Sequence, residues 1–289
     1  MNSCPVSVVI PTFNRCTLLP RAIDSIHRQT VQCEEIIIVD DGSTDTTRDY
    51  LAFLATEKKT KLKVIHQENR GPAAARNRGI CEAQCDYIAF LDSDDHWQKR
   101  KLELQYGLMR ENKDFLISHT KEKWLRRGVH LNQKKKHIPQ HGDIFQHCLL
   151  LCAVGMSTVM VMKELFFLVG KFDESMQCCE DYDFWLRVSS KFPFLLLDKP
   201  LTIKEGGRED QVSCIYRMGM DRFRIDSLKK LLDSGALSDE QYAFALEEFV
   251  KKIHVFGNGC LKHGNTTIGN TYLDLISRYK ASVPGSTLR

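Results

Sequence analysis

The sequence has no hydrophobic run long enough to cross a membrane. A spanning helix needs about 18 consecutive apolar residues, and the longest apolar stretch, residues 149–162, is interrupted by Gly155 and two hydroxyl residues. We expect this stretch to be buried core. The apolar run at residues 6–10 is too short for the hydrophobic part of a signal peptide and ends at Pro11. We therefore expect a cytoplasmic protein.

A strong charge of one sign is also missing. The 41 basic and 37 acidic residues leave a net charge of +4, so we expect no field that attracts nucleic acid. No G-x-G-x-x-G motif follows a predicted strand, which disfavours a dehydrogenase.

The eleven cysteines show no CxxC spacing. Their odd number, without a secretory signal, favours reduced thiols. Two pairs, Cys81 with Cys85 and Cys148 with Cys152, lie four residues apart on predicted helices. We expect these cysteines to be small buried hydrophobes, with zinc ligation as the alternative.

The first hundred residues contain alternating apolar strands and helices. Predicted strands lie at residues 6–10, 35–39, 62–66 and 87–91, and predicted helices at 17–29, 44–55 and 71–83. Continuous apolar strands separated by helices predict an α/β fold with a parallel sheet that is covered on both faces.

Beyond residue 100 the alternation becomes less regular. We expect helices at 99–111 and 181–191, strands at 115–119, 157–162 and 194–197, and an irregular basic segment at 121–141. From about residue 218 the pattern is wholly helical, with helices at 222–232, 238–262 and 267–279, the second beginning near Ser238. We place a domain boundary near residue 215.

Three carboxylates follow the predicted strand at 87–91. Asp92, Asp94 and Asp95 lie within four residues, and carboxylates this close repel one another unless a cation or hydrogen-bond donors compensate them. A hard divalent cation with oxygen ligands is the simplest compensation. The cluster therefore suggests a metal site at the carboxyl end of a strand.

Polar segments also follow two other predicted strands, at residues 11–15 and 40–45. The carboxyl ends of parallel strands meet at one crevice, so we expect all three segments to form one site. The alternative for residues 40–43 is a turn whose Ser43 or Thr44 caps the next helix.

Six motifs stand in order along the chain. They read VSVVIPTFNR at 6–15, IVDDGSTD at 38–45, GPAAARNRG at 71–79, FLDSDDHW at 90–97, GKFDE at 170–174 and EDYDFWLR at 180–187. Together they resemble glycosyltransferase family 2, and their order and spacing make the resemblance specific. It covers roughly residues 4–215, and no motif is recognised in residues 216–289.

The resemblance implies a GT-A fold, with a Rossmann-like, mainly parallel central sheet flanked by helices and, in this chain, a C-terminal helical extension at 216–289. Residues 1–115 would bind a nucleotide-diphosphate sugar, with UDP the preferred nucleotide, and residues 116–215 would form the acceptor side. The resemblance also implies Mn²⁺ or Mg²⁺ as cofactor, because the departing diphosphate needs a cation.

The resemblance assigns roles by position. Asp41 would bind the nucleobase, and Arg76 would lie near the diphosphate or the base. Within the DXD-type triplet, Asp92 would contact the ribose and Asp94 would ligate the metal. Asp95 is either a supporting acid or a solvated or helix-capping one. The other residues expected to line the nucleotide pocket are Pro11, Thr12, Phe13 and Ser93.

The resemblance makes Asp181 the base that accepts the acceptor's hydroxyl proton in an inverting transfer. Asp183 is the reserve candidate. The alternative is that Glu180 and Asp181 complement a helix N-terminus. Trp185 is expected to be core rather than a sugar platform.

Two further segments have open roles. Arg126, Arg127 and residues 134–137 form a basic stretch beside Trp124, which we expect to be a solvated loop, with an anionic acceptor site as the alternative. The charged loop at residues 206–213 follows a predicted strand and could close over the diphosphate through Arg208 or Ser213.

The resemblance thus implies a metal-dependent inverting hexosyltransferase that acts on a glycan or lipid-linked acceptor in surface polysaccharide synthesis. It would work in the cytoplasm, with peripheral contact at the inner face of a membrane as an extension of that prediction. The C-terminal helices are candidates for dimerisation or membrane docking. A sugar nucleotidyltransferase and a non-catalytic nucleotide-binding member are the alternatives.

Overall fold

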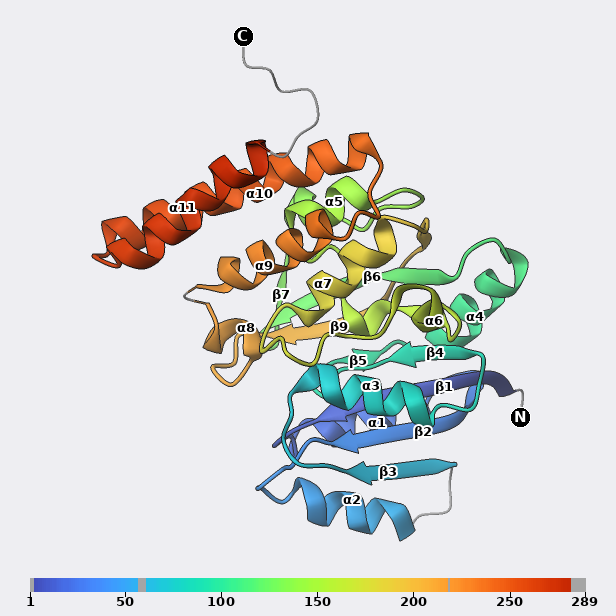
Figure 1. The fold of residues 1–289 in the computed structure, drawn as a ribbon. Coiled ribbons are helices and arrows are strands. Elements are labelled where there is room, and N and C mark those ends of the chain that lie inside the picture. The colour runs from blue at the N-terminus through green and yellow to red at the C-terminus, as the bar shows by residue number, and fades with distance from the viewer. Residues whose placement is uncertain (1–2, 57–60, 218, 282–289) are drawn as a thin grey trace.

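A mixed β-sheet of nine strands forms the centre of the computed structural model, which describes residues 3–56, 61–217 and 219–281 (Figure 1). The strand order is β3-β2-β1-β4-β8-β6-β9-β5, and β7 pairs with β6 outside that path. The strands are β1 (Ser3–Thr12), β2 (Gln32–Asp40), β3 (Leu62–His66), β4 (Tyr87–Phe90), β5 (His96–Trp97), β6 (Ile117–Arg126), β7 (Val129–Leu131), β8 (Met160–Met162) and β9 (Leu195–Gly206). The helices are α1 (Leu19–His27), α2 (Thr47–Thr56), α3 (Pro72–Glu82), α4 (Lys101–Glu111), α5 (Phe145–Leu150), α6 (Leu165–Val169), α7 (Glu180–Ser189), α8 (Val212–Ile215), α9 (Met220–Asp233), α10 (Asp239–Lys262) and α11 (Thr266–Ala281), with 3₁₀ turns η1 (Lys135–His137) and η2 (Met156–Thr158).

The first half of the sheet confirms the parallel arrangement expected from the sequence. β1 pairs in parallel with β2 and β4, and β2 pairs in parallel with β3. Val8 and Ile10 pack in the core shared with α1 and α4, whereas Val9 packs in the core on the α3 side. Burial on both faces explains why β1, β2 and β4 contain continuous apolar runs, whereas the edge strand β3 is only partly buried.

The second half of the sheet is mixed, and two of its strands extend beyond their expected ends. β8 is antiparallel to β4 and β6, while β6 and β9 pair in parallel over most of their length. The prediction of an irregular segment at 121–141 is wrong at its start, because β6 continues to Arg126 and the chain then turns back to form β7. The strand expected at 194–197 extends to Gly206. Both extensions are only partly buried, so they lack the apolar run by which a buried strand is recognised.

Loop contacts replace the helix cap expected at Ser43 or Thr44. α2 begins at Thr47, whose backbone N–H donates to Asp45 Oδ1 at 2.9 Å. Ser43 Oγ instead accepts the backbone N–H of Asn14 at 2.9 Å, and Thr44 N–H donates to Asn14 Oδ1 at 2.8 Å. The expected cap is therefore wrong, and the two hydroxyl residues join the loops that follow β1 and β2.

The C-terminal helices share the apolar core of the sheet domain. Ser238 begins α10 as expected, since its hydroxyl accepts the Gln241 N–H at 3.2 Å in a capping box. α9 packs against α7, and α10 packs against α5 and α11 (Figure 1). Phe249 and Ile253 are fully buried in the same cluster as residues of α3 and α7. The boundary near residue 215 stays a prediction, and residues 282–289 of the proposed extension lie outside the described residues.

No helix in the described part of the chain is both long and apolar enough to cross a membrane. The stretch at 149–162 forms the end of α5, η2 and β8, and most of its side chains are buried, as expected.

Candidate functional site

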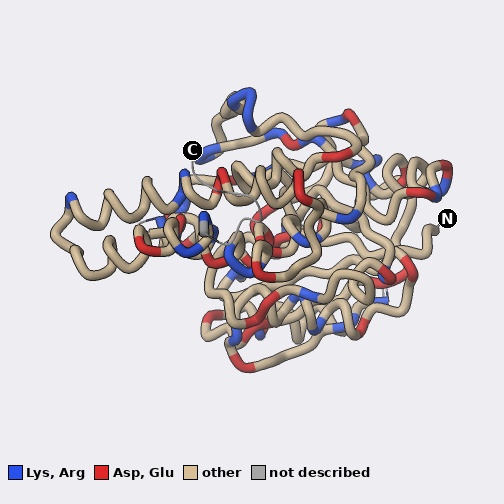
Figure 2. Tube along the Cα trace, turned by 45° about the horizontal axis from the view of Figure 1, so that its top comes forward, with Lys and Arg blue, Asp and Glu red and all other residues tan. Residues whose placement is uncertain are grey.

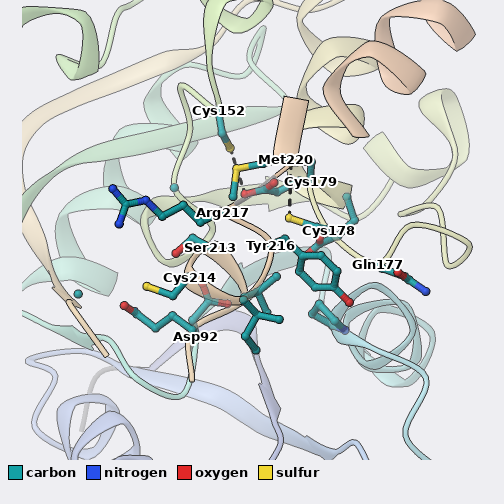
Figure 3. A pocket seen from close by; sticks show the side chains of 18 of the residues that line it. Asp92, Cys152, Gln177, Cys178, Cys179, Ser213, Cys214, Tyr216, Arg217 and Met220 are labelled. Atoms are coloured by element: carbon teal, nitrogen blue, oxygen red, sulfur yellow. Dashed lines mark hydrogen bonds between the residues drawn. The ribbon is translucent and has the colours of Figure 1, made fainter. Parts of the chain in front are cut away.

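A cavity of about 1830 Å³ opens at the carboxyl edge of β1, β2 and β4. Its walls include the loop before α3, the first turn of α7 and the segment after β9. Figure 3 shows Asp92 at the end of β4 together with side chains of residues 177–179 and of the segment after β9. Every residue predicted for nucleotide, metal or base lines it: Pro11, Thr12, Phe13, Asp41, Arg76, Asp92, Ser93, Asp94 and Asp181. The fold therefore gathers these residues in one place, while their individual roles stay predictions.

Asp41 is held by the loop that leads into α3. Its Oδ1 accepts hydrogen bonds from Gln67 Nε2 at 2.7 Å and from the Arg70 N–H at 2.9 Å, and its Oδ2 accepts the Gly71 N–H at 2.8 Å. Burial raises the pKa of Asp41, and these donors oppose the rise. The carboxylate is thus fixed at the edge of the cavity before any ligand binds.

The Phe13 ring forms a flat apolar part of the cavity wall. Its ring is 40% exposed in the cavity lining, while Pro11 and Thr12 behind it are buried. The buried Thr12 hydroxyl has no hydrogen-bond partner among the described residues. Asn14, at φ 52°, turns the chain directly after Phe13. An exposed ring beside a fixed carboxylate is suited to binding a planar base with N–H donors.

Arg76 joins the strand-end acids to helix α7. Its guanidinium donates to Asp92 Oδ1 at 2.9 Å and to Glu180 Oε1 at 2.6 Å. Only 7% of the Arg76 side chain is exposed. Burial raises the pKa of Glu180, and the adjacent Arg76 charge works against that rise. Arg76 therefore serves as a buried cation that holds two carboxylates at one wall of the cavity.

Asp94 faces the segment after β9. Its Oδ2 forms an ion pair with Arg208 and accepts a hydrogen bond from Gln211 Nε2 at 3.3 Å. The Arg208 of the predicted closing loop therefore contacts Asp94, while Ser213 lines the cavity and is exposed. In these contacts a guanidinium supplies the positive charge that the sequence led us to expect from a metal.

A divalent cation fits this site only if the substrate helps to hold it. The described residues contain no group of three or more His, Cys, Asp or Glu that could hold a metal ion. Mg²⁺ commonly binds through one or two protein carboxylates and completes its shell with substrate phosphates and water. Asp94, which pairs with Arg208 in this structure, would provide such a carboxylate, and Asp92 lies two residues away.

Asp95 is a structural acid rather than a solvated one. It is 3% exposed, and its Oδ2 accepts the Ser157 hydroxyl at 2.7 Å while its Oδ1 accepts the Glu205 N–H at 3.2 Å. Burial, followed by the charge of Asp94, raises the pKa of Asp95 well above its ordinary value. Asp95 thus ties the acid cluster to η2 and β9.

Asp181 stands in the first turn of α7 and lines the cavity. Its Oδ2 accepts a hydrogen bond from the Cys152 thiol at 3.0 Å, and its Oδ1 accepts the Tyr182 N–H at 2.7 Å. The reserve candidate Asp183 is 4% exposed and binds Arg187 Nε at 3.0 Å. Of the two candidates for the base, Asp181 is therefore the one that lines the cavity.

The remaining predictions from sequence concern core and surface. Trp185 is 1% exposed and is core, as expected. The basic stretch is exposed at Arg126 and Arg127 and at Lys134–136, as expected of a solvated loop, although its first part is strand rather than loop. All eleven cysteines are free. Cys81 is exposed, so its prediction as a buried hydrophobe is wrong.

Sequence reasoning gave no role to Asn77. Its side-chain amide donates to the Phe172 carbonyl at 2.8 Å and accepts the Phe172 N–H at 3.0 Å, and it also donates to Glu174 Oε1 at 2.9 Å. Asn77 therefore fastens the motif at 71–79 to the motif at 170–174. The two motifs could be recognised in the sequence, but nothing in it reports that they bind each other.

Glu122 and Lys204 also line the cavity without a signal in the sequence. The charge of Glu122 is the largest influence on Lys204 and raises the pKa of its ammonium. Glu122 Oε1 is buried without a hydrogen-bond partner in the described part of the chain. These residues lie on the partly buried extensions of β6 and β9 that the sequence failed to reveal.

The comparisons with known proteins agree with this geometry. The sequence profile described as "Glycosyl transferase family 2" matches residues 7–160. An uncharacterized glycosyltransferase of Rickettsia conorii is 38% identical over 209 residues, which are 70% of this chain and 33% of that protein. TuaG of Bacillus subtilis, a putative teichuronic acid biosynthesis glycosyltransferase, is 43% identical over 106 residues, 37% of this chain and 42% of that protein. The chain spans about a third of the length of the first curated relatives it matches.

Among solved structures, S. aureus TarS 1–349 in complex with UDP-GlcNAc superposes with a TM-score of 0.70. The match covers 89% of this chain and 73% of that chain at 19% sequence identity. At this identity the likeness shows the fold. The GT-A arrangement with a C-terminal helical region, expected from the sequence, is confirmed.

Proposed function

Because this chain belongs to glycosyltransferase family 2, we propose that it is a metal-dependent inverting transferase that moves a sugar from a UDP-sugar to a hydroxyl acceptor. The observation that carries the proposal is the placement of Asp41, Asp94 and Asp181 around one cavity. A nucleobase site, a cation ligand and a base are the three groups that such a reaction needs.

The donor half of the site is formed by the strand ends. Asp41 accepts the N–H of the uracil beside the Phe13 ring, and Asp92, fixed by Arg76, accepts the ribose hydroxyl. Asp94 holds Mn²⁺ or Mg²⁺ against the diphosphate, and the cation, when bound, neutralises the charge of the departing group. The solved TarS complexes contain UDP and UDP-GlcNAc, which supports UDP as the nucleotide.

The acceptor half is formed by α7 and the segment after β9. As the acceptor oxygen attacks the anomeric carbon, its proton passes to Asp181 and the bond to the diphosphate oxygen breaks. A single displacement of this kind inverts the anomeric centre. Arg208 and Gln211 leave Asp94 when the diphosphate arrives and can then contact the phosphate oxygens.

The setting we propose is the synthesis of a surface polysaccharide on a glycan or lipid-linked acceptor. TuaG's description as a teichuronic acid biosynthesis enzyme supports it. The proposal extends to α10 and α11 as the surface for a second copy or for peripheral contact at the inner face of a membrane.

The test is a donor panel with purified protein, in which binding of each nucleotide sugar is measured by calorimetry with and without Mn²⁺, together with its slow hydrolysis. Asp94→Asn should abolish the Mn²⁺-dependent part of donor binding, and Asp181→Asn should keep donor binding and lose transfer. Asp86→Asn is the matched control, because Asp86 is exposed at the opposite end of β4. Folded protein that binds no nucleotide sugar would refute the proposal. Release of pyrophosphate from UTP and a sugar 1-phosphate would instead identify a nucleotidyltransferase.

A further inference from the structure

Cys152 contacts the carboxylate that the proposed function makes the base. Cys152 lies on the segment between α5 and η2, and its Sγ is 3.0 Å from Asp181 Oδ2. Figure 3 shows the Cys152 side chain and its hydrogen bond. The other carboxylate oxygen accepts the Tyr182 N–H at 2.7 Å. Each oxygen of Asp181 therefore has one protein donor, and the carboxylate plane is fixed at two points.

The thiol can act only as the donor in this contact. Burial raises the pKa of Cys152 well above its ordinary value, and the charge of Asp181 and the hydrogen bond to it raise this pKa further. The thiol therefore stays protonated at neutral pH. Because S–H is a weak donor, it orients the carboxylate while stabilising the ionised form less than a hydroxyl would.

The other charged and titratable groups near Asp181 have partners of their own. Arg76 is paired with Asp92 and Glu180, and Arg224 on α9 is paired with Asp221. The thiols of Cys178 and Cys179, which precede α7, lie 3.6 Å from each other. Cys152 is thus the side chain whose hydrogen bond to Asp181 is seen in the described part of the chain.

We propose that Cys152 is a positioning residue for the transfer reaction and that its thiol holds the Asp181 carboxylate toward the acceptor. The proposal rests on the proposed function, because the position of Asp181 matters to the rate only if it is the base. A displacement of about 1 Å of a catalytic group costs up to about 100-fold in rate.

The first test compares Cys152→Ala, Cys152→Ser and Cys81→Ala. The measured quantities are kcat and KM for hydrolysis of the UDP-sugar that wild-type protein turns over fastest with Mn²⁺, beginning with UDP-GlcNAc. We expect Cys152→Ala to lower kcat by about 10-fold or more with unchanged KM. The serine variant should recover most of the rate, because its hydroxyl restores a donor. Cys81 is exposed on α3 and does not line the cavity, so Cys81→Ala should behave as wild type.

The pH profile distinguishes positioning from a structural role. Loss of the donor disfavours the ionised carboxylate, so the acidic limb of the kcat profile should move to higher pH in Cys152→Ala, whereas the stronger hydroxyl donor should move it to lower pH in Cys152→Ser. Wild-type kcat and an unchanged profile in Cys152→Ala would overturn the proposal. A loss of rate that serine does not restore would overturn it as well.

A second test does not depend on turnover. The rate at which iodoacetamide labels each cysteine at pH 8 is followed by peptide mass spectrometry in wild type and in Asp181→Asn. Removing the Asp181 charge should lower the pKa of Cys152, so its labelling should become several-fold faster while the labelling rate of the exposed Cys81 is unchanged. An unchanged Cys152 rate would refute the contact itself. Wild-type protein that binds no nucleotide sugar would overturn the proposed function and with it the positioning role of Cys152, while the labelling still decides whether the two residues touch.

Discussion

Replacing Arg76 with methionine should destabilise the protein by about 3–5 kcal/mol, because it leaves a buried carboxylate without its cation. Glu180 is 6% exposed and its Oε1 lies 2.6 Å from Arg76, whereas the Asp92 side chain is 27% exposed and keeps some contact with water. Most of the loss should therefore come from Glu180. Urea unfolding followed by circular dichroism measures it.

The loss in Arg76→Met should also depend on pH. Burial raises the pKa of Glu180 in the folded protein even with Arg76 in place, and removing that cation raises it further. A carboxyl with a higher pKa in the folded than in the unfolded protein binds its proton more tightly in the folded state. The free energy of unfolding therefore falls as the pH rises through the pKa of the unfolded state. The deficit of Arg76→Met should therefore be larger at pH 8 than at pH 5.

Two further variants decide whether this reasoning holds. Arg76→Met with Glu180→Gln removes the stranded charge, and we expect it to recover about 2 kcal/mol of the loss. Arg78→Met on the same helix is the control: its side chain is 55% exposed and pairs with Glu82 at the surface, so it should cost at most about 0.5 kcal/mol. A loss below about 1 kcal/mol at pH 8 in Arg76→Met, or no recovery in the double variant, would refute the buried-charge account.

Gly79→Ala should destabilise the protein by about 1–2 kcal/mol net of its helix propensity, because a Cβ at that position would lie 2.3 Å from Val9 Cγ1. Gly107→Ala, where nothing lies within 4 Å of the added Cβ, should instead stabilise by about 0.5–1 kcal/mol, and equal signs for the two in thermal unfolding would contradict the packing argument. Burial lowers the pKa of His119 from 6.5 to about 4, so the unfolded chain takes up a proton in this range before the folded protein does, and stability should fall by about 2 kcal/mol between pH 7.5 and pH 5. That slope should flatten in His119→Gln, and an undiminished slope would exclude His119 as its source.

The sequence predicted the strands that consist largely of apolar residues. Strands β1, β2 and β4 are largely buried, whereas β3 is half-exposed. The predicted positions of all four agree with the structure to within a few residues. The extension of β6 was missed because residues 121–126 mix charged and apolar side chains on a half-exposed strand. The extension of β9 is likewise only partly buried. An apolar pattern reflects burial, so it does not reveal the part of a strand that is exposed to solvent.

The candidate site was predicted as a set of residues but not as a set of contacts. The motifs named Asp41, Arg76, Asp92 and Asp94, and the strand ends bring them together. The ion pair between Arg208 and Asp94 joins residues more than a hundred positions apart, and so does the pairing of Arg76 with Glu180. Such pairings follow from where α7 packs in the core and from the place of β9 within the sheet, which no local pattern encodes.

The acid cluster shows what this difference means for the metal. Three neighbouring carboxylates were expected to share one cation, yet each has its own compensation: Asp92 binds Arg76, Asp94 binds Arg208, and Asp95 is buried among hydrogen-bond donors. A divalent cation at Asp94 must therefore displace a guanidinium that already carries positive charge. The diphosphate shifts that balance, because it offers Arg208 new oxygen acceptors and the cation new ligands at the same time. It follows that metal and donor should bind together far more tightly than either binds alone, which makes the occupied metal site a property of the donor complex rather than of the free protein.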